Sequence, residues 1–274
     1  HLGSDSKDKL PWVQGAFGLG GETTYRNAKS IILVTRRAPD ILGLADQDRI
    51  ALAVVFWESH EKGKGAYYLV DPHTRLPLSV PALRCTDFGH GTHLALIAYG
   101  VEGYHRKHLG DERSFDTVLN TRLFSPITPV RFSHYTRDRN EYLRGLERRL
   151  EVGDRPGLTQ GSEVLPYNAD GRTYHLPVRY YLFAKRHDAG ERRKFVAYDH
   201  AVVFTSNGQV HYHWSPSAFV QKTGLKKLGE RIFVVVETDE LPIQFRTSLF
   251  TADRAELVRS DPAIRLEEDL AGFL

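Results

Sequence analysis

The sequence consists largely of short apolar runs, rich in β-branched and aromatic residues, that are separated by turns of Gly, Pro and Asp. Such runs predict strands at residues 30–36, 50–57, 66–70, 93–99, 128–132, 174–184, 195–205, 210–214 and 232–237. Helical patterns are fewer, at residues 115–123, at 219–228 and from about residue 251. The pattern predicts sheets covered by a few helices, an α/β protein of the α+β two-layer sandwich type.

The clearest turn signal is Ser206-Asn207-Gly208-Gln209, which lies between two apolar runs. Asn-Gly in this position favours a two-residue hairpin, because both residues tolerate positive φ. A helix, a strand and a second helix are expected to follow this hairpin. The second part of the chain is therefore predicted to have the order β-β-α-β-α.

The composition changes near residue 134, where we place a domain boundary. Residues 137–150 alternate Arg and Glu at helical spacing, and residues 154–171 are polar and contain Gly and Pro. We therefore predict one domain over residues 1–133 and a second over 134–274. The 274 residues suit two domains, at about 100–200 residues each.

The charge and cysteine content indicate a soluble protein of a reducing compartment. The net charge is +3, charged residues make up 26% of the chain, and Cys85 has no second cysteine to pair with. No apolar stretch approaches the roughly 20 residues of a membrane span. A cytoplasmic location and no membrane partner are the expectation, and a catalytic role for Cys85 is not expected.

A glycine cluster near the start, Gly15-Ala16-Phe17-Gly18-Leu19-Gly20-Gly21, indicates an anion-binding loop. Glycines lack the Cβ atoms that hold a ligand away, so successive backbone amides can converge on one phosphate group. Ser6-Lys7 precedes the cluster, and the run at 30–36 follows it. Small hydroxyl residues, a lysine, a glycine loop and a strand in this order suggest a lid over a nucleotide.

This arrangement resembles the ATP lid of the GHKL superfamily, which includes gyrase, the ninety-kilodalton heat-shock chaperones, histidine kinases and MutL, with the MORC proteins close by. In that superfamily a Ser-Lys-containing lid leads into Gly-x-Phe-Gly-x-Gly, which surrounds the triphosphate. The resemblance implies ATP with Mg²⁺ as the cofactors. It implies phosphate or nucleotide contacts for Ser6, Lys7, Gly15, Phe17, Gly18, Gly20 and Gly21.

A second resemblance lies far along the chain, at residues 235–246. The sequence Val-Val-Glu-Thr-Asp-Glu-Leu-Pro-Ile-Gln-Phe-Arg is similar to a segment of the heat-shock chaperone middle domain whose arginine reaches the γ-phosphate. The matching residue, Arg246, is the implied catalytic residue, because a guanidinium suits the charge on a transferring phosphoryl group. The alternative is that Arg246 pairs with Asp239 or Glu240.

A third match is Gly91-Thr92, which resembles the Gly-Thr turn that opens a strand late in the ATPase domain and implies a nucleotide contact for Thr92. Histidines nearby, at 90 and 93, and on the later strand, at 211 and 213, raise the alternative of a metal site. Residues i and i+2 of a strand point to one face. Because no Cys or carboxylate set lies beside them at ligand spacing, we favour ordinary packing and predict no metal ligands.

Together these matches imply the C-terminal half of a GHKL ATPase domain followed by a transducer domain with the fold of a small-subunit ribosomal protein. The implied function is an ATP-driven machine that couples nucleotide state to domain rearrangement or to closure of a homodimer. In the superfamily the general-base glutamate, the Mg²⁺-holding asparagine and the adenine-reading aspartate precede the lid. We therefore expect this chain alone not to hydrolyse ATP.

A different class of function remains open, namely a nucleic-acid-binding or scaffolding protein that uses the same fold without hydrolysis. Residues 172–196 contain seven Lys and Arg against Asp188 and Glu191. A basic hairpin of this kind can follow a nucleic-acid backbone. The charged segment is equally consistent with a solvated loop end. The seven basic residues are Arg172, Arg179, Lys185, Arg186, Arg192, Arg193 and Lys194.

Overall fold

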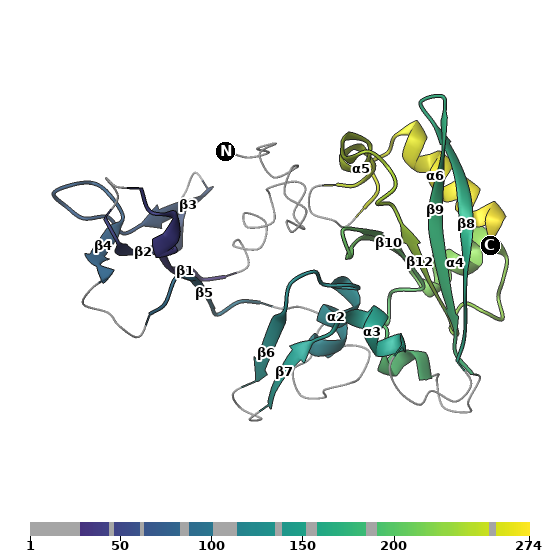
Figure 1. Ribbon diagram of the computed structural model, residues 1–274, viewed down its shortest axis with the longest axis horizontal. Coiled ribbons are helices and arrows are strands. Elements are labelled where there is room, and N and C mark those ends of the chain that lie inside the picture. The colour runs from purple at the N-terminus through teal and green to yellow at the C-terminus, as the bar shows by residue number, and fades with distance from the viewer. Residues whose placement is uncertain are drawn as a thin grey trace. The chain divides into compact units, whose positions relative to one another are not determined.

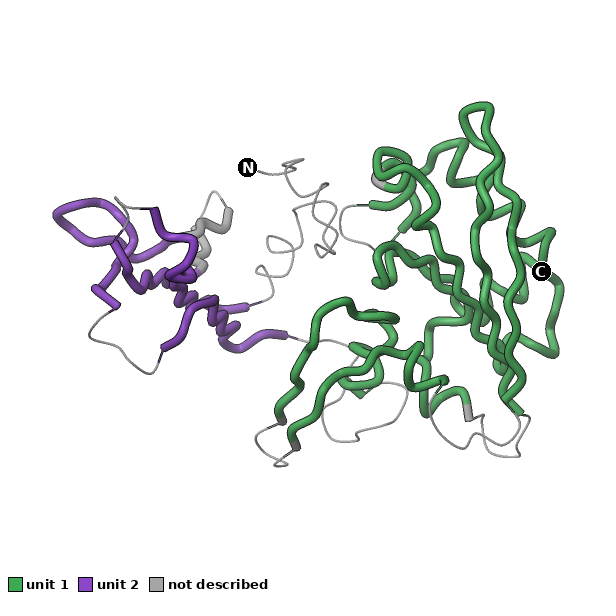
Figure 2. The backbone as a smooth tube through the Cα atoms, viewed as in Figure 1, with its two compact units in different colours: residues 1–20, 103–274 green, residues 21–102 purple. Residues whose placement is uncertain are grey.

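The computed structural model describes residues 28–43, 47–60, 63–82, 88–100, 114–134, 139–151, 158–184, 191–251 and 256–274. The chain divides into two compact units (Figures 1 and 2). Unit 2 comprises residues 21–102, and unit 1 comprises residues 1–20 and 103–274. The boundary predicted at residues 133/134 lies inside unit 1, at the end of a strand, and the predicted assignment of the two domains stays a prediction.

Unit 2 contains a five-stranded antiparallel sheet in the order β3-β2-β1-β5, with β4 also paired to β2. Its strands are β1 (Ser30–Arg36), β2 (Arg49–His60), β3 (Gly63–Tyr68), β4 (Leu78–Pro81) and β5 (Gly91–Ile97), and the short 3₁₀ helix η2 (Pro39–Ile41) follows β1. Four of these strands were predicted within a few residues, because their β-branched runs end at Gly, Pro and Asp. The described core of this unit is small and includes Ala28, Ile31, Ile50 and Ala82.

Unit 1 begins, among the described residues, with α2 (Phe115–Arg122), the hairpin β6 (Val130–His134) and β7 (Arg139–Leu143), and α3 (Gly145–Glu151). The helical spacing of Arg and Glu over 137–150 corresponds to a helix only in its second half, since the first half forms β7. Charged residues at helical spacing also suit an exposed two-stranded hairpin. Gly145, the first residue of α3, has φ +76° and lies against the Phe124 carbonyl, where a side chain would not fit.

The main sheet of unit 1 has five strands in the order β11-β10-β12-β9-β8 (Figure 1). They are β8 (Thr159–Ala169), β9 (Arg172–Leu182), β10 (Val202–Ser206), β11 (Gln209–Trp214) and β12 (Ile232–Glu237). β10 and β12 are parallel and the other neighbours are antiparallel. The helical elements of this region are η5 (Glu191–Lys194), α4 (Pro216–Thr223), α5 (Ile243–Leu249) and α6 (Asp261–Phe273).

The apolar run of β12 lies in the middle of this sheet and supplies both of its cores. Val234 and Val236 belong to one core, with Leu266 and Leu270 of α6, and Phe233 and Val235 belong to the other. The second core also contains Leu146 and Leu150 of α3. Figure 1 accordingly shows α4 and α6 on one side of the sheet and α2 and α3 on the other. A strand whose side chains are buried on both faces of the sheet is typical of the centre of that sheet.

The predicted hairpin at Asn207-Gly208 is confirmed. Asn207 has φ 50° and Gly208 has φ 71°, as a two-residue turn with both φ angles positive requires, and Ser206 pairs with Gln209. From this hairpin onward the order is β10-β11-α4-β12-α5-α6, which is the predicted β-β-α-β-α order with α5 as an additional helix that was not predicted, and the α+β class is confirmed. Two bounds differ from the prediction. β10 begins at Val202 and not at residue 195, and the final helix begins at Asp261 and not near residue 251.

The polar segment predicted at 154–171 contains the edge strand β8. Its apolar residues Leu165, Tyr167 and Ala169 are buried, and the residues between them are exposed. An edge strand with one solvated face has few apolar residues, and so its composition resembles that of a linker. None of the helices in the described residues is both long and apolar enough to cross a membrane.

Candidate functional site

Arg246 lies on α5, the short helix that begins after Pro242 and follows the central strand β12. Its Nη1 atom donates three hydrogen bonds, to Ser206 Oγ (2.8 Å), to Asn207 Oδ1 (3.1 Å) and to Asp239 Oδ1 (2.9 Å). The Arg246 side chain is 14% exposed. Arg246 therefore joins α5 to the β10–β11 turn and to the turn that follows β12.

The ion pair with Asp239 is the alternative that the sequence left open for Arg246. Asp239 is 44% exposed and also accepts a 2.7 Å hydrogen bond from the Asn207 backbone N–H. Arg246 Nε is buried and has no hydrogen-bond partner in the described part of the chain. The guanidinium is thus held in one orientation, and a phosphate would have to compete with Asp239 for Nη1. Its catalytic role stays a prediction.

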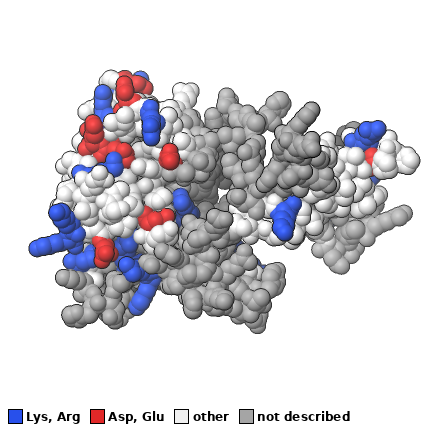
Figure 3. Space-filling view, turned by 180° about the vertical axis from the view of Figure 1, so that it is seen from behind, with Lys and Arg blue, Asp and Glu red and all other residues white. Residues whose placement is uncertain are grey.

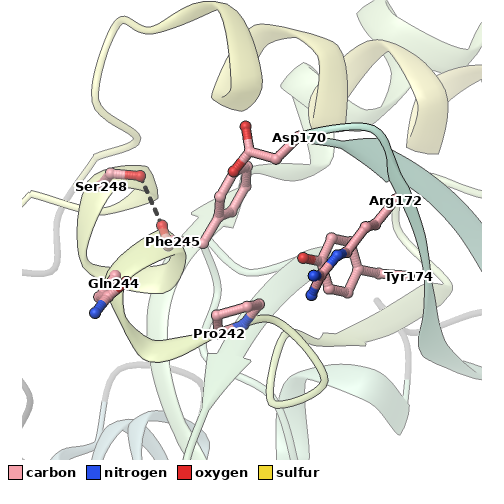
Figure 4. Close-up of a pocket in the computed structure, with 7 residues that line it drawn as sticks. All are labelled: Asp170, Arg172, Tyr174, Pro242, Gln244, Phe245 and Ser248. Atoms are coloured by element: carbon pink, nitrogen blue, oxygen red, sulfur yellow. Dashed lines mark hydrogen bonds between the residues drawn. The ribbon is translucent and has the colours of Figure 1, made fainter.

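A hollow of about 430 Å³ lies between α5 and the end of the β8–β9 hairpin (Figure 4). Asp170, Arg172 and Tyr174 line it from the hairpin, and Pro242, Gln244, Phe245 and Ser248 line it from α5 and the residue before it. Successive helical residues are rotated by about 100°, so Arg246 points away from the side of α5 that faces the hollow. The hollow and the Arg246 network are therefore separate features.

Thr92 lies in unit 2, at the start of β5 and opposite Thr35 of β1. Their Oγ1 atoms are 3.0 Å apart, and Thr35 Oγ1 also donates to the Gly91 carbonyl at 3.3 Å. Gly91 has φ 125°, a backbone conformation that favours glycine. The predicted strand opening at Gly-Thr is present, and Thr92 is exposed on the sheet.

A salt bridge beside Thr92 fixes the approach to β5. Arg36 binds Asp48 at 2.7 Å and donates to the Phe88 carbonyl at 2.8 Å. The hydrogen bond from Arg36 holds the pKa of Asp48 below its usual value. These contacts position the sheet, and they leave the nucleotide contact of Thr92 a prediction.

The predicted lid residues Ser6, Lys7, Gly15, Phe17, Gly18, Gly20 and Gly21 lie outside the described residues. Thr92 and Arg246 belong to different units. A common site formed by Thr92, Arg246 and the lid stays a prediction.

The basic segment 172–196 does not form one surface in the residues that are described. Arg179 is bound to Glu147 and Glu237, and Arg192 is buried and donates to the Ile232 carbonyl. Arg172 lies at the start of β9. Arg193 and Lys194, which are exposed, lie near the other end of β9, because the neighbouring Phe195 stacks on Phe183 just past that end. Eleven strand residues span about 36 Å, so these charges are far apart. On the face shown in Figure 3, basic and acidic side chains of unit 1 lie interspersed.

The sequence did not predict a cluster formed by Asp199, His200 and His213, which the fold brings together. Asp199 Oδ1 lies 2.5 Å from His200 Nδ1, and Asp199 Oδ2 lies 3.6 Å from His213 Nε2. The two imidazole rings stack in parallel, with centroids 4.0 Å apart. No spacing in the sequence signals this cluster, because Asp199 and His213 are separated by β10 and the hairpin turn.

His211, which was considered together with His213, takes a different position. Phe204 pairs with Tyr212 and Thr205 pairs with Val210, so His211 is an extra residue in a β-bulge. His211 is buried and packs against Phe250, with ring centroids 5.2 Å apart. The bulge thus separates two histidines that a regular strand would place on one face.

Comparison with known proteins adds no relative to these observations. A scan against protein-family models finds no match, and a search of curated proteins finds no significant match.

Proposed function

We propose that this chain is part of a GHKL-type ATPase, in which it contributes the ATP lid and a transducer domain. The observation that carries the proposal is the position of Arg246, on a short helix directly after the central parallel strand, with its guanidinium fixed in orientation. The resemblance at residues 235–246 assigns to this residue the contact with the γ-phosphate. The glycine cluster at 15–21 supports the same proposal independently, because it lies more than 200 residues away.

The proposed division of roles follows from the chemistry of each group. Backbone amides of Gly18 and Gly20, together with Lys7, hold the β- and γ-phosphates. Arg246 offsets charge on the γ-phosphate when the domains close. Mg²⁺, when bound with ATP, neutralises further phosphate charge. The nucleotide then favours one domain orientation, and closure of a homodimer is the proposed output.

The described residues fit a phosphate ligand in one respect. Arg246 is a guanidinium that is 14% exposed and already oriented, so little entropy is lost when it meets an anion. Its partner Asp239 is the more exposed of the two, at 44%. An ion pair with an exposed carboxylate contributes less than about 1 kcal/mol, so a phosphate can displace it.

Titration calorimetry with Mg·ATP tests the lid assignment in the intact protein. Replacing both Gly18 and Gly20 by leucine should abolish binding, because each new side chain occupies the space of a phosphate oxygen. The control is Gly272→Leu on α6, where an added Cβ meets nothing within 4 Å. Equal affinities in the double variant and the control would reject the lid assignment.

A further inference from the structure

The residues Asp199, His200 and His213, here called the DHH cluster, offer three potential metal ligands. One ligand atom from each lies within 4.8 Å of the other two. His200 is completely buried, and the side chains of His213 and Asp199 are 19% and 25% exposed. The cluster therefore extends from the interior of unit 1 to its surface. We propose that the DHH cluster binds a divalent transition-metal ion of the Zn²⁺ type.

The types of ligand support a transition metal. Two imidazoles and one carboxylate are common ligands of Zn²⁺, and three protein ligands leave a fourth position for water or a partner. In a tetrahedral site with bonds of about 2.0–2.1 Å, ligand atoms lie about 3.4 Å apart. The separation of 3.6 Å between Asp199 Oδ2 and His213 Nε2 is close to this value.

The ring geometry requires one adjustment. A metal ion lies in the plane of each imidazole that binds it, whereas the rings of His200 and His213 are parallel within 7°. The two rings must tilt toward a common point when the ion binds. In the structure His200 presents Nδ1 to the Asp199 carboxylate and His213 presents Nε2 to it, so binding through the other nitrogen of either ring requires that ring to turn about its Cβ–Cγ bond.

Unsatisfied nitrogen atoms provide independent support. His200 Nε2 and His213 Nδ1 are buried and have no hydrogen-bond partner among the residues that the structure describes. A buried polar atom without a partner is costly. If the rings turn or tilt around a bound ion, these nitrogen atoms, which have no partner within the described part of the protein, can coordinate it.

The protonation states also suit a metal ion. Burial lowers the pKa of His213 to about 3 and lowers that of His200, so both rings are neutral at pH 7. Burial acts to raise the pKa of Asp199, but the hydrogen bond with His200 and the charge interactions with His200 and His213 together outweigh it, and the pKa is about 2. Neutral imidazoles and an ionised carboxylate are the forms that coordinate metals.

Positive charges near the cluster act against any cation, so the types of ligand decide which ion is favoured. Arg122 of α2 acts on both histidines, and Arg192 of η5 acts on His200. With only one carboxylate among its three ligands, the cluster is unsuited to Ca²⁺ or Mg²⁺, which require several oxygen ligands. Bonds to imidazole nitrogen favour Zn²⁺ instead. The bound ion would join the loop before β10 to β11.

The test is Zn²⁺ binding to the intact protein, measured by competition with a chromogenic chelator at pH 7.5. One ion should bind per chain, and Asp199→Asn and His213→Ala should each weaken binding by at least about tenfold. His175→Ala, at an exposed position on β9, is the control and should bind as the unchanged protein does. Mg²⁺ at the same concentration should not compete.

A second measurement does not depend on whether the variants fold. The imidazole ¹⁵N resonances of His200 and His213 in the unchanged protein should shift on addition of one equivalent of Zn²⁺, and that of His175 should not. Equal Zn²⁺ affinity in the unchanged protein and in Asp199→Asn, or resonances of His200 and His213 that do not move, would overturn the proposal.

Discussion

Asp239 accepts a 2.9 Å hydrogen bond from Arg246 and a 2.7 Å hydrogen bond from the backbone N–H of Asn207. One carboxylate therefore holds together the hairpin turn after β10 and the helix after β12. The two turns follow the parallel strands β10 and β12 and lie at the same end of the sheet. Any ligand that attracts Arg246 must alter this junction.

Arg246→Ala is expected to lower kcat for ATP in the intact protein on the order of 10³-fold, with little change in nucleotide affinity. The reason is that its proposed phosphate contact forms in the closed, reacting state. Steady-state kinetics and calorimetry measure the two quantities separately. Arg259→Ala, an exposed arginine before α6, is the control.

Asp239→Asn separates the two roles of Arg246. It removes the ionic partner and leaves the guanidinium, so turnover should be kept while the free energy of unfolding falls by less than about 1 kcal/mol. If Arg246→Ala and Asp239→Asn had the same small effect on turnover, Arg246 would be a structural residue only.

Gly208→Ala and Gly171→Ala form a matched pair, because the two glycines have φ 71° and φ 72°. Alanine at positive φ costs about 1 kcal/mol at either position. At Gly208 the new Cβ would also collide with the Ser125 carbonyl, whereas at Gly171 it meets nothing within 4 Å. Urea unfolding should show a further loss of about 1–3 kcal/mol for Gly208→Ala. Equal losses would show that the Ser125 contact adjusts without cost.

Phe233→Ala should lower the free energy of unfolding of unit 1 by about 3–5 kcal/mol, because Phe233 is fully buried on β12 and its loss leaves a cavity. Phe273, near the end of α6, is 38% exposed, and Phe273→Ala should cost far less. Chemical denaturation followed by circular dichroism measures both variants. Comparable losses would contradict the central position of β12.

Acid should weaken the contact between α3 and the sheet through Glu147. Burial acts to raise the pKa of Glu147, but hydrogen bonds from Ser125 and Arg179 outweigh it and the pKa is lowered. A carboxylate with a lowered pKa contributes stability above its unfolded value, near 4.5, and this contribution is lost as the pH falls through the folded value.

The corresponding test compares the unchanged protein with Glu147→Gln in urea at several pH values. The difference in unfolding free energy should be about 1–2 kcal/mol at pH 7 and should shrink below pH 4. Glu163→Gln, at an exposed position on β8, is the control. A difference that stays constant with pH would show that the Glu147 charge contributes nothing.

The sequence determined the local elements wherever a short pattern is sufficient. The apolar run at 232–237 forms β12, and the run at 30–36 forms β1 with the predicted bounds. Asn207-Gly208 forms the predicted turn, because positive φ is a local property of these two residues. The sequence was less informative for strands with one face exposed to solvent. β7 lies in a segment with helical spacing of charges, and β8 lies in a segment that is polar and contains Gly and Pro.

Only the tertiary structure decided which distant side chains meet. Whether Arg246 pairs with Asp239 depends on the approach of two turns, and the sequence left both possibilities open. The DHH cluster requires a loop to pack against β11, and the bulge at His211 turns that residue away from His213. Long-range pairing depends on strand order and register. These are set by burial of the whole sheet, which no local pattern of residues contains.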